Sequence, residues 1–285
     1  MLGALVYRAV RWLCRLIPRR AAYGFARGVS YLCYLLQPAR RRVVCDNLTH
    51  VTGDRGVARR LVRPVFLSFG MYLYDFFRSQ KLTRQTIGDI VELATPEHVE
   101  ESYKSGRGVI CLTAHLGNWE IGGQALALFG YPVTAVVLPH SSPEVDELFL
   151  AERRATGLRP VSVGVAVREC YKALRRGEMV ALVGDWDTTE GGREADFFGA
   201  PALMPRGPAA MAVRTGALIL PGCTIRDRGR DFTIHTLPSF EPASTGDRER
   251  DEEETARLCR RALETFISRW PDQWFMFHRM WKDEG

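Results

Sequence analysis

The chain has 285 residues, of which 46% are hydrophobic and 25% charged, a composition that excludes a disordered polymer and supports one large core. Seven scattered cysteines include no C-x-x-C pair, which excludes a disulfide framework or a zinc ribbon and favours a reducing, cytosolic setting. The net charge of +6 is uneven, because residues 1–42 hold nine arginines and no Asp, Glu or Lys. A nucleic-acid groove would spread its basic residues over the folded body, so no nucleic-acid partner is expected.

The basic N-terminal segment predicts an anchor on a membrane surface. Four arginines recur at spacings of three and four on one stripe of residues 1–20: Arg8, Arg11, Arg15 and Arg19. Residues 21–38 are apolar and aromatic apart from Arg27, but they fall short of the roughly 20 residues that span a bilayer comfortably. We predict that residues 1–42 form two short amphipathic helices in the interface, with arginines facing anionic headgroups. The alternatives are a helical pair packed on the body and a single tilted span.

The sequence predicts that residues 43–285 form one α/β domain, in which a central, mostly parallel sheet is flanked by helices. After a helix at 57–78, short apolar runs alternate with helical patterns from residue 108 onward. The expected strands are 108–115, 133–138, 159–163, 178–185, 217–226 and 231–237. The expected helices are 119–129, 143–156, 165–176 and 207–215, each followed by a stop glycine, and 247–270. Because residues 227–231 are too few for a crossover, the last two strands are expected to be antiparallel.

The stretch "TAHLGNWE" (113–120) holds the strongest candidate site. A β-rich run feeds into His115, Asn118 is suited to cap a helix, and Glu120 falls in the first turn of that helix. Reactive groups in open α/β sheets gather at the carboxyl ends of strands. His278 and Asp283 repeat the same spacing without this setting. At this turn from strand to helix, Glu120 is predicted to fold back and accept a hydrogen bond from one ring nitrogen of His115, which leaves the other ring nitrogen free as a base.

The nucleophile is expected to be a hydroxyl of the substrate, because the chain offers no convincing one of its own. A G-x-S-x-G elbow is absent from the sequence. Cys111 stands four strand residues from His115, about 13 Å, and reads as a buried hydrophobe. The sequence also lacks a P-loop, H-E-x-x-H and G-x-G-x-x-G, so neither a metal nor another cofactor is expected.

The motif "HLGNWE", with "GDWD" (184–187), the block 195–221 and "WPDQWFMFHRMW" (270–281), resembles the late lipid A acyltransferases of bacteria. These lauroyl and myristoyl transferases carry an H-x4-D/E motif, and the related phosphatidylinositol mannoside acyltransferases are similar. The resemblance covers nearly the whole chain. It implies an α/β acyltransferase on the cytoplasmic face of the bacterial inner membrane, bound peripherally.

The resemblance also implies the reaction and its partners. An acyl thioester, on acyl carrier protein or coenzyme A, gives its chain to a hydroxyl of a membrane glycolipid such as a lipid A precursor. His115 is the expected general base and Glu120 its orienting carboxylate. The backbone amides of Gly117 and Asn118 are candidate donors to the oxyanion.

Further residues are candidates for substrate binding. An acidic loop after a predicted strand can shape the acceptor site, with Asp185, Asp187, Arg193, Glu194 and Asp196. Arg206 precedes a helix and is suited to a phosphate. An arginine surface can receive an acidic carrier protein, with Arg153, Arg154, Arg159, Arg175 and Arg176.

Three other functions remain open from the sequence. The acceptor can be a phosphatidylinositol mannoside, another glycolipid or a lysophospholipid. A non-catalytic lipid-binding protein can keep the fold, and an esterase would use water in place of an alcohol. Chain length, donor and acceptor are not determined by these residues.

Overall fold

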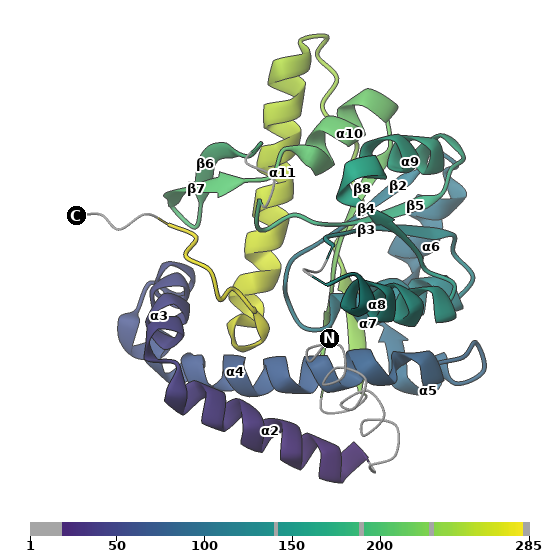
Figure 1. The fold of residues 1–285 in the computed structure, drawn as a ribbon. Coiled ribbons are helices and arrows are strands. Elements are labelled where there is room, and N and C mark those ends of the chain that lie inside the picture. Colours follow the sequence, from purple (N-terminus) through teal and green to yellow (C-terminus); the bar gives the residue numbers. More distant parts are fainter. Residues whose placement is uncertain (1–18, 140–141, 188–190, 228–230, 282–285) are drawn as a thin grey trace.

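The computed structural model describes residues 19–139, 142–187, 191–227 and 231–281 (Figure 1). The arginine stripe predicted for the N-terminus falls mainly in residues 1–18, outside these ranges. The described chain begins with three helices, α2 (Arg19–Leu36), α3 (Pro38–Thr52) and α4 (Arg55–Arg78). Among the described residues, no helix has the length and apolarity that a membrane span requires.

Local signals explain where these helices start and stop. Pro38 occupies the first turn of α3, where its missing N–H costs nothing, and Gly53 ends α3 in the left-handed conformation. Asp54 then caps α4, because its carboxylate accepts from the amides of Gly56 and Val57. This cap starts the helix two residues before the predicted position of 57.

The central sheet has seven strands in the order β1-β9-β8-β2-β5-β3-β4. All neighbouring pairs are parallel except β8 and β9, which are antiparallel as expected from their short connection. The six predicted strands are confirmed as β2 (Val109–Thr113), β3 (Val133–Val137), β4 (Arg159–Ser162), β5 (Met179–Val183), β8 (Leu218–Ile225) and β9 (Phe232–Thr236). The sequence did not predict β1 (Val91–Leu93) or the separate hairpin of β6 (Arg193–Phe197) and β7 (Ala200–Met204), since β1 has only three residues and β6, with the sequence READF, is not an apolar run.

Helices cover both faces of the sheet, so the predicted fold class is confirmed for the body (Figure 1). Ile110 and Leu112 of β2 belong to the large core that includes α9 (Val163–Arg175), α10 (Gly207–Thr215) and α11 (Arg248–Arg269). Val109 and Cys111 point to the opposite face, against α6 (Pro96–Lys104) and α7 (Trp119–Leu128). The remaining elements are α5 (Ile87–Ile90), α8 (Pro143–Ala155), η1 (Ser79–Lys81) and η2 (Pro271–Gln273).

A buried polar cluster fastens α2 and α4 to the sheet. Asp75 of α4 accepts from the Tyr23 hydroxyl at 2.7 Å and forms a close ion pair with Arg226, which follows β8. The Arg226 guanidinium also donates to the Tyr23 oxygen at 2.9 Å. The predicted boundary at residue 42 falls inside α3, and this cluster ties the residues before it to the body.

Candidate active site

The two residues at the centre of the site follow neighbouring parallel strands. Thr113 of β2 pairs in register with Val183 of β5, and the ladder continues as the Gly184 amide donates to the Thr113 carbonyl at 2.8 Å. His115 and Asp185 each lie two residues beyond their strand. Equal offsets from a shared register therefore bring the two side chains together at the carboxyl edge of the sheet.

His115 is hydrogen-bonded to Asp185 through both its ring and its backbone. Its Nδ1 lies 2.8 Å from Oδ1, and its amide donates to Oδ2 at 2.9 Å. An ionised carboxylate only accepts, so the ring proton belongs on Nδ1, and Nε2 keeps a free lone pair. The sequence predicted a carboxylate for this position, but assigned Glu120; the structure corrects the partner to Asp185.

Glu120 instead forms a buried ion pair with Arg153 of α8. Arg153 donates to both carboxylate oxygens, from Nε at 3.0 Å and from Nη2 at 2.6 Å, and the two side chains are only 10% and 7% exposed. Glu120 is the second residue of α7, and its side chain extends to the neighbouring helix rather than back to the ring. Because both carboxylate oxygens of Glu120 are hydrogen-bonded to Arg153, this ion pair links α7 to α8.

Both carboxylates nevertheless act on the charge of His115. Burial lowers the pKa of His115, but the charge and hydrogen bond of Asp185 and the charge of Glu120 outweigh it, so this pKa lies above its ordinary value. Burial raises the pKa of Asp185, but the His115 charge and hydrogen bonds from His115 and Trp274 outweigh it, so this pKa lies below its ordinary value. The pair therefore favours an ionised Asp185 and stabilises the imidazolium.

Aromatic rings enclose the histidine without sealing it. Trp119 and Trp186 meet the imidazole edge to face, with centroids 5.1 and 6.2 Å away. Trp186 also stacks on His278 at 4.2 Å, which brings that residue to the margin of the site. The His115 side chain remains 27% exposed, so the ring is accessible from outside the protein.

The backbone amides predicted as oxyanion donors are already engaged. The Gly117 amide donates to the Gln273 carbonyl at 2.8 Å, and the Asn118 amide donates to the Thr224 carbonyl at 2.7 Å. Gly117 has φ +63°, and a Cβ there would lie 2.0 Å from the Thr224 oxygen, so the close approach requires glycine. The prediction for these two amides is therefore wrong in this geometry, while Asn118 caps α7 as predicted, accepting from the Ile121 amide.

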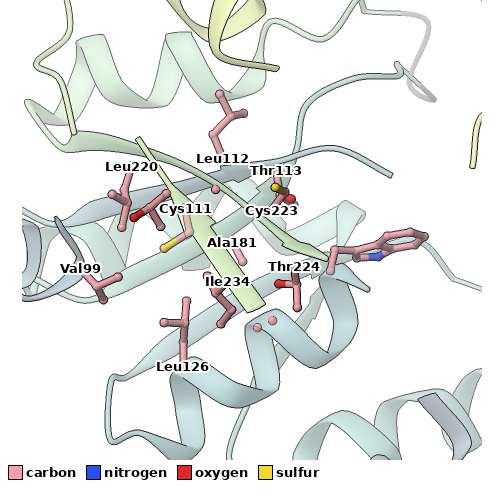
Figure 2. Close-up of a pocket in the computed structure, with 15 residues that line it drawn as sticks. Val99, Cys111, Leu112, Thr113, Leu126, Ala181, Leu220, Cys223, Thr224 and Ile234 are labelled. Atoms are coloured by element: carbon pink, nitrogen blue, oxygen red, sulfur yellow. The ribbon is translucent and has the colours of Figure 1, made fainter. Parts of the chain in front are cut away.

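An apolar pocket begins beside the site and runs between α7 and the sheet (Figure 2). Trp119 lines it at the end next to His115, and four small residues also line it. These are Gly122 and Gly123 of α7, Ala181 of β5 and Gly222 of β8. Cys111 also lines the pocket, and burial raises the pKa of its thiol to about 12, which fits the hydrophobic role predicted for it.

Comparison with known proteins identifies the family of the chain. The family model described as bacterial lipid A biosynthesis acyltransferase matches residues 1–283. The chain belongs to this acyltransferase family. It is 26% identical to the phosphatidylinositol mannoside acyltransferase of Mycolicibacterium smegmatis, covering 97% of this chain and 90% of the relative. The Mycobacterium tuberculosis protein of the same description is 28% identical over 96% and 86%. The Escherichia coli lipid A biosynthesis lauroyltransferase is 25% identical over 96% and 89%.

The other predicted substrate-binding residues of this acyltransferase lie on and around the β6–β7 hairpin. Arg193 pairs with Glu249 of α11 at 3.2 Å, and Arg206 pairs with Glu252 of the same helix at 3.2 Å. Glu194 and Asp196 are exposed on the opposite side of β6, and Asp187 lies against Gly192 before that strand. Of the acidic loop, Asp185 is the residue that the structure joins to His115; substrate contacts of the others stay predictions.

The predicted arginine surface of the acyltransferase needs one correction. Arg153 is buried against Glu120, with its guanidinium over the rings of Phe76 and Phe149. It therefore offers no charge to a carrier protein. Arg154 and Arg159 are exposed but pair with Glu147 and Glu178.

Sequence reasoning also missed Trp274, whose indole nitrogen donates to Oδ2 of Asp185 at 2.9 Å. It lies on the C-terminal segment, 89 residues beyond Asp185. The sequence did contain one signal for the pairing of His115 with Asp185, because the predicted strands 108–115 and 178–185 end at these two residues. The order of strands that makes them neighbours is a tertiary feature.

Proposed function

We propose that this protein is an O-acyltransferase that moves a fatty acyl chain from an acyl thioester to a hydroxyl of a membrane glycolipid. The donor is carried on acyl carrier protein or coenzyme A, and the reaction takes place at the cytoplasmic face of the bacterial inner membrane. The observation that carries this proposal is the His115–Asp185 pair, which stands at an open sheet edge beside an apolar pocket.

The geometry supports general-base catalysis by His115. Nε2 accepts the proton of the glycolipid hydroxyl as its oxygen attacks the thioester carbonyl carbon. When the tetrahedral intermediate collapses, the C–S bond breaks, and the imidazolium returns the proton to the leaving thiolate. The products are an ester and a free thiol. Asp185 orients the ring and balances its positive charge. The negative charge of Glu120, which is paired with Arg153, also stabilises the imidazolium.

The pocket between α7 and the sheet is suited to the acyl chain. Its described lining is dominated by apolar and small side chains, and it starts at Trp119, which touches His115. A chain that lies there presents its thioester to the base. Transfer of apolar surface out of water, at about 25 cal/mol per Å², supplies the binding energy.

Enlarging a side chain in this pocket tests the assignment. Ala181→Leu fills space next to Cys111, so we expect the preferred acyl chain to shorten by roughly two to four carbons, because a packed interior leaves no room for added methyl groups. Competition among acyl donors of different length, resolved by mass spectrometry, measures the shift. Ala135→Leu is the matched control, since Ala135 is the register partner of Ala181 on β3 and is not among the residues that line the pocket. An unchanged chain profile in Ala181→Leu would contradict the acyl role.

The exposed face of α2 supports attachment to a lipid surface. Large apolar side chains gather on this helix and are 44–71% exposed: Phe25, Val29, Tyr31, Leu32, Leu35 and Leu36. Exposed arginines accompany them, with Arg27 on α2 and Arg40 and Arg42 at the start of α3. An apolar stripe beside cations is suited to the boundary between acyl chains and anionic headgroups. We infer a peripheral, monotopic attachment through the segment within residues 1–42.

Surface variants test this attachment better than deletion, because Tyr23 takes part in the buried cluster with Asp75. Phe25→Ser/Leu32→Ser/Leu36→Ser is expected to lower binding to phosphatidylglycerol-containing vesicles by at least about tenfold, since each buried apolar side chain contributes about 1.5–3 kcal/mol. Flotation of vesicles measures it. Leu203→Ser, on the hairpin and 48% exposed in the parent, is the control and should float normally. Full binding by the triple variant would reject α2 as the contact.

The acceptor is tested with purified protein, labelled acyl donors and a panel of glycolipids. A lipid A precursor and a phosphatidylinositol mannoside are the first two, since relatives carry both descriptions. Labelled ester on one of them supports the proposal. Free fatty acid formed without an acceptor indicates an esterase, and lipid binding without any product indicates a non-catalytic protein.

A further inference from the structure

We propose that Trp274 is a positioning residue for the His115–Asp185 pair: its indole N–H holds one carboxylate oxygen so that the other stays on the imidazole. This inference rests on the proposed function, because it assigns a task within the same catalytic pair. It concerns a residue 89 positions from Asp185 in the chain.

The hydrogen bonds of Asp185 divide cleanly between its two oxygens. Oδ1 receives the His115 ring, while Oδ2 receives the His115 amide and the Trp274 indole, each at 2.9 Å. The terminal torsion of an aspartate is broad and roughly two-fold, so a carboxylate held at one oxygen alone can swing. Two donors converging on Oδ2 remove that freedom and leave Oδ1 in place for the ring.

Burial makes the indole difficult to replace with water. Asp185 is fully buried and Trp274 is 1% exposed. A carboxylate in such surroundings depends on protein donors, because unsatisfied polar groups there are expensive. Loss of the indole N–H therefore removes a contact that solvent has little space to restore.

The backbone around Trp274 is built onto the same corner as His115. The Phe275 amide donates to the His115 carbonyl at 2.8 Å, and the Gln273 carbonyl accepts from the Gly117 amide at 2.8 Å. Leu116 and Trp274 form the bridge between these two bonds. The indole and the imidazole are thus mounted on two short antiparallel segments that pair with each other, which fixes the distance between them.

Asn47 fastens the continuation of this segment to α3. Its side-chain nitrogen donates to the carbonyls of Met276 and His278, at 3.0 and 2.7 Å, and its oxygen accepts from the Met280 amide at 3.2 Å. Asn47 is 2% exposed. The C-terminal segment is therefore held in place by α3, and Trp274 lies where this segment reaches the site.

The indole also influences the charge of the pair. Burial raises the pKa of Asp185, and the Trp274 hydrogen bond is one of the contacts that lower it again. Without that donor, the carboxylate is more basic and attracts the imidazolium more strongly. The expected sign is a rise in the pKa of His115, opposite to the fall expected when Asp185 itself is neutralised.

The experiment replaces only the donor. Trp274→Phe keeps an aromatic ring without the N–H, and 3-benzothienylalanine at position 274 keeps the bicyclic shape if the phenylalanine variant folds poorly. Titration of the labelled His115 ring by NMR needs no turnover, and the pH dependence of kcat/KM reports the same group during acyl transfer. We expect the His115 transition to move to higher pH and the plateau of kcat/KM to fall roughly tenfold, as for loss of a hydrogen bond to a charged group.

Trp281→Phe is the matched control. Trp281 is buried like Trp274, but its indole donates to the carbonyls of Phe197 and Ala200. It should lose stability without moving the His115 transition. An unchanged His115 titration in both position-274 variants, or an equal shift in Trp281→Phe, would overturn the inference. Absence of acyl transfer by the parent protein would overturn the proposed function, and the ring titration would still decide the role of Trp274.

Discussion

Acyl transfer is expected to fall by about 10²–10⁴-fold when His115 is replaced with alanine, the usual contribution of a general base. The variant should stay folded, because the ring is partly exposed and the amide that bonds Asp185 belongs to the backbone. Initial rates with a labelled acyl donor measure the loss, and circular dichroism confirms folding.

His98→Ala is the control for this prediction. His98 lies on α6, where its ring contacts the Thr236 hydroxyl at 3.2 Å, and has no part in the proposed chemistry. Its variant should retain activity within a few-fold. A folded His115→Ala protein with near-parental rates would remove the general base from the mechanism.

Asp185→Asn is expected to lower activity by a similar factor, roughly 10²–10⁴-fold, through the tautomer of His115. An amide facing Nδ1 can donate to it, which moves the ring proton to Nε2, the atom that must accept one. The same change removes the charge that raises the pKa of His115. Activity is lost as the pH falls through this pKa, so the acid limb of kcat/KM should move to lower pH in the variant. A pH–rate profile measures both effects.

The variant Glu120→Ala distinguishes the role of the Glu120 carboxylate from that of Asp185. It leaves the Arg153 guanidinium buried without its partner, which costs about 3–5 kcal/mol of unfolding free energy. The acid limb should also move down, because the charge of Glu120 contributes to the raised pKa of His115. Urea denaturation measures the stability. Glu120→Leu/Arg153→Leu removes both charges and should recover most of it; a stable Glu120→Ala protein would contradict the ion-pair role.

Several local features were predictable because they depend on short stretches of chain. Alternating apolar runs and stop glycines located six strands of the central sheet from residue 108 onward and the helices between them, and a short connection predicted that β8 and β9 are antiparallel. His115 was found by the same logic, since a β-run that ends in a histidine before a helix cap is a local pattern. The family resemblance supplied the acyl chemistry.

The partners of that histidine depend on contacts between distant segments. A carboxylate partner for His115 was predicted, and local spacing assigned that role to Glu120, while Asp185 was predicted only to shape the acceptor site. The order of strands puts β5 beside β2 and so brings Asp185 to His115, while Arg153 of α8 pairs with Glu120 of α7. Trp274 arrives from the C-terminal segment, and the same segment occupies the Gly117 amide. Sequence alone predicted which strand-to-helix turn carries the proposed base; the tertiary structure decided which charges and donors meet there, because hydrogen-bond partners are determined by distance in space rather than along the chain.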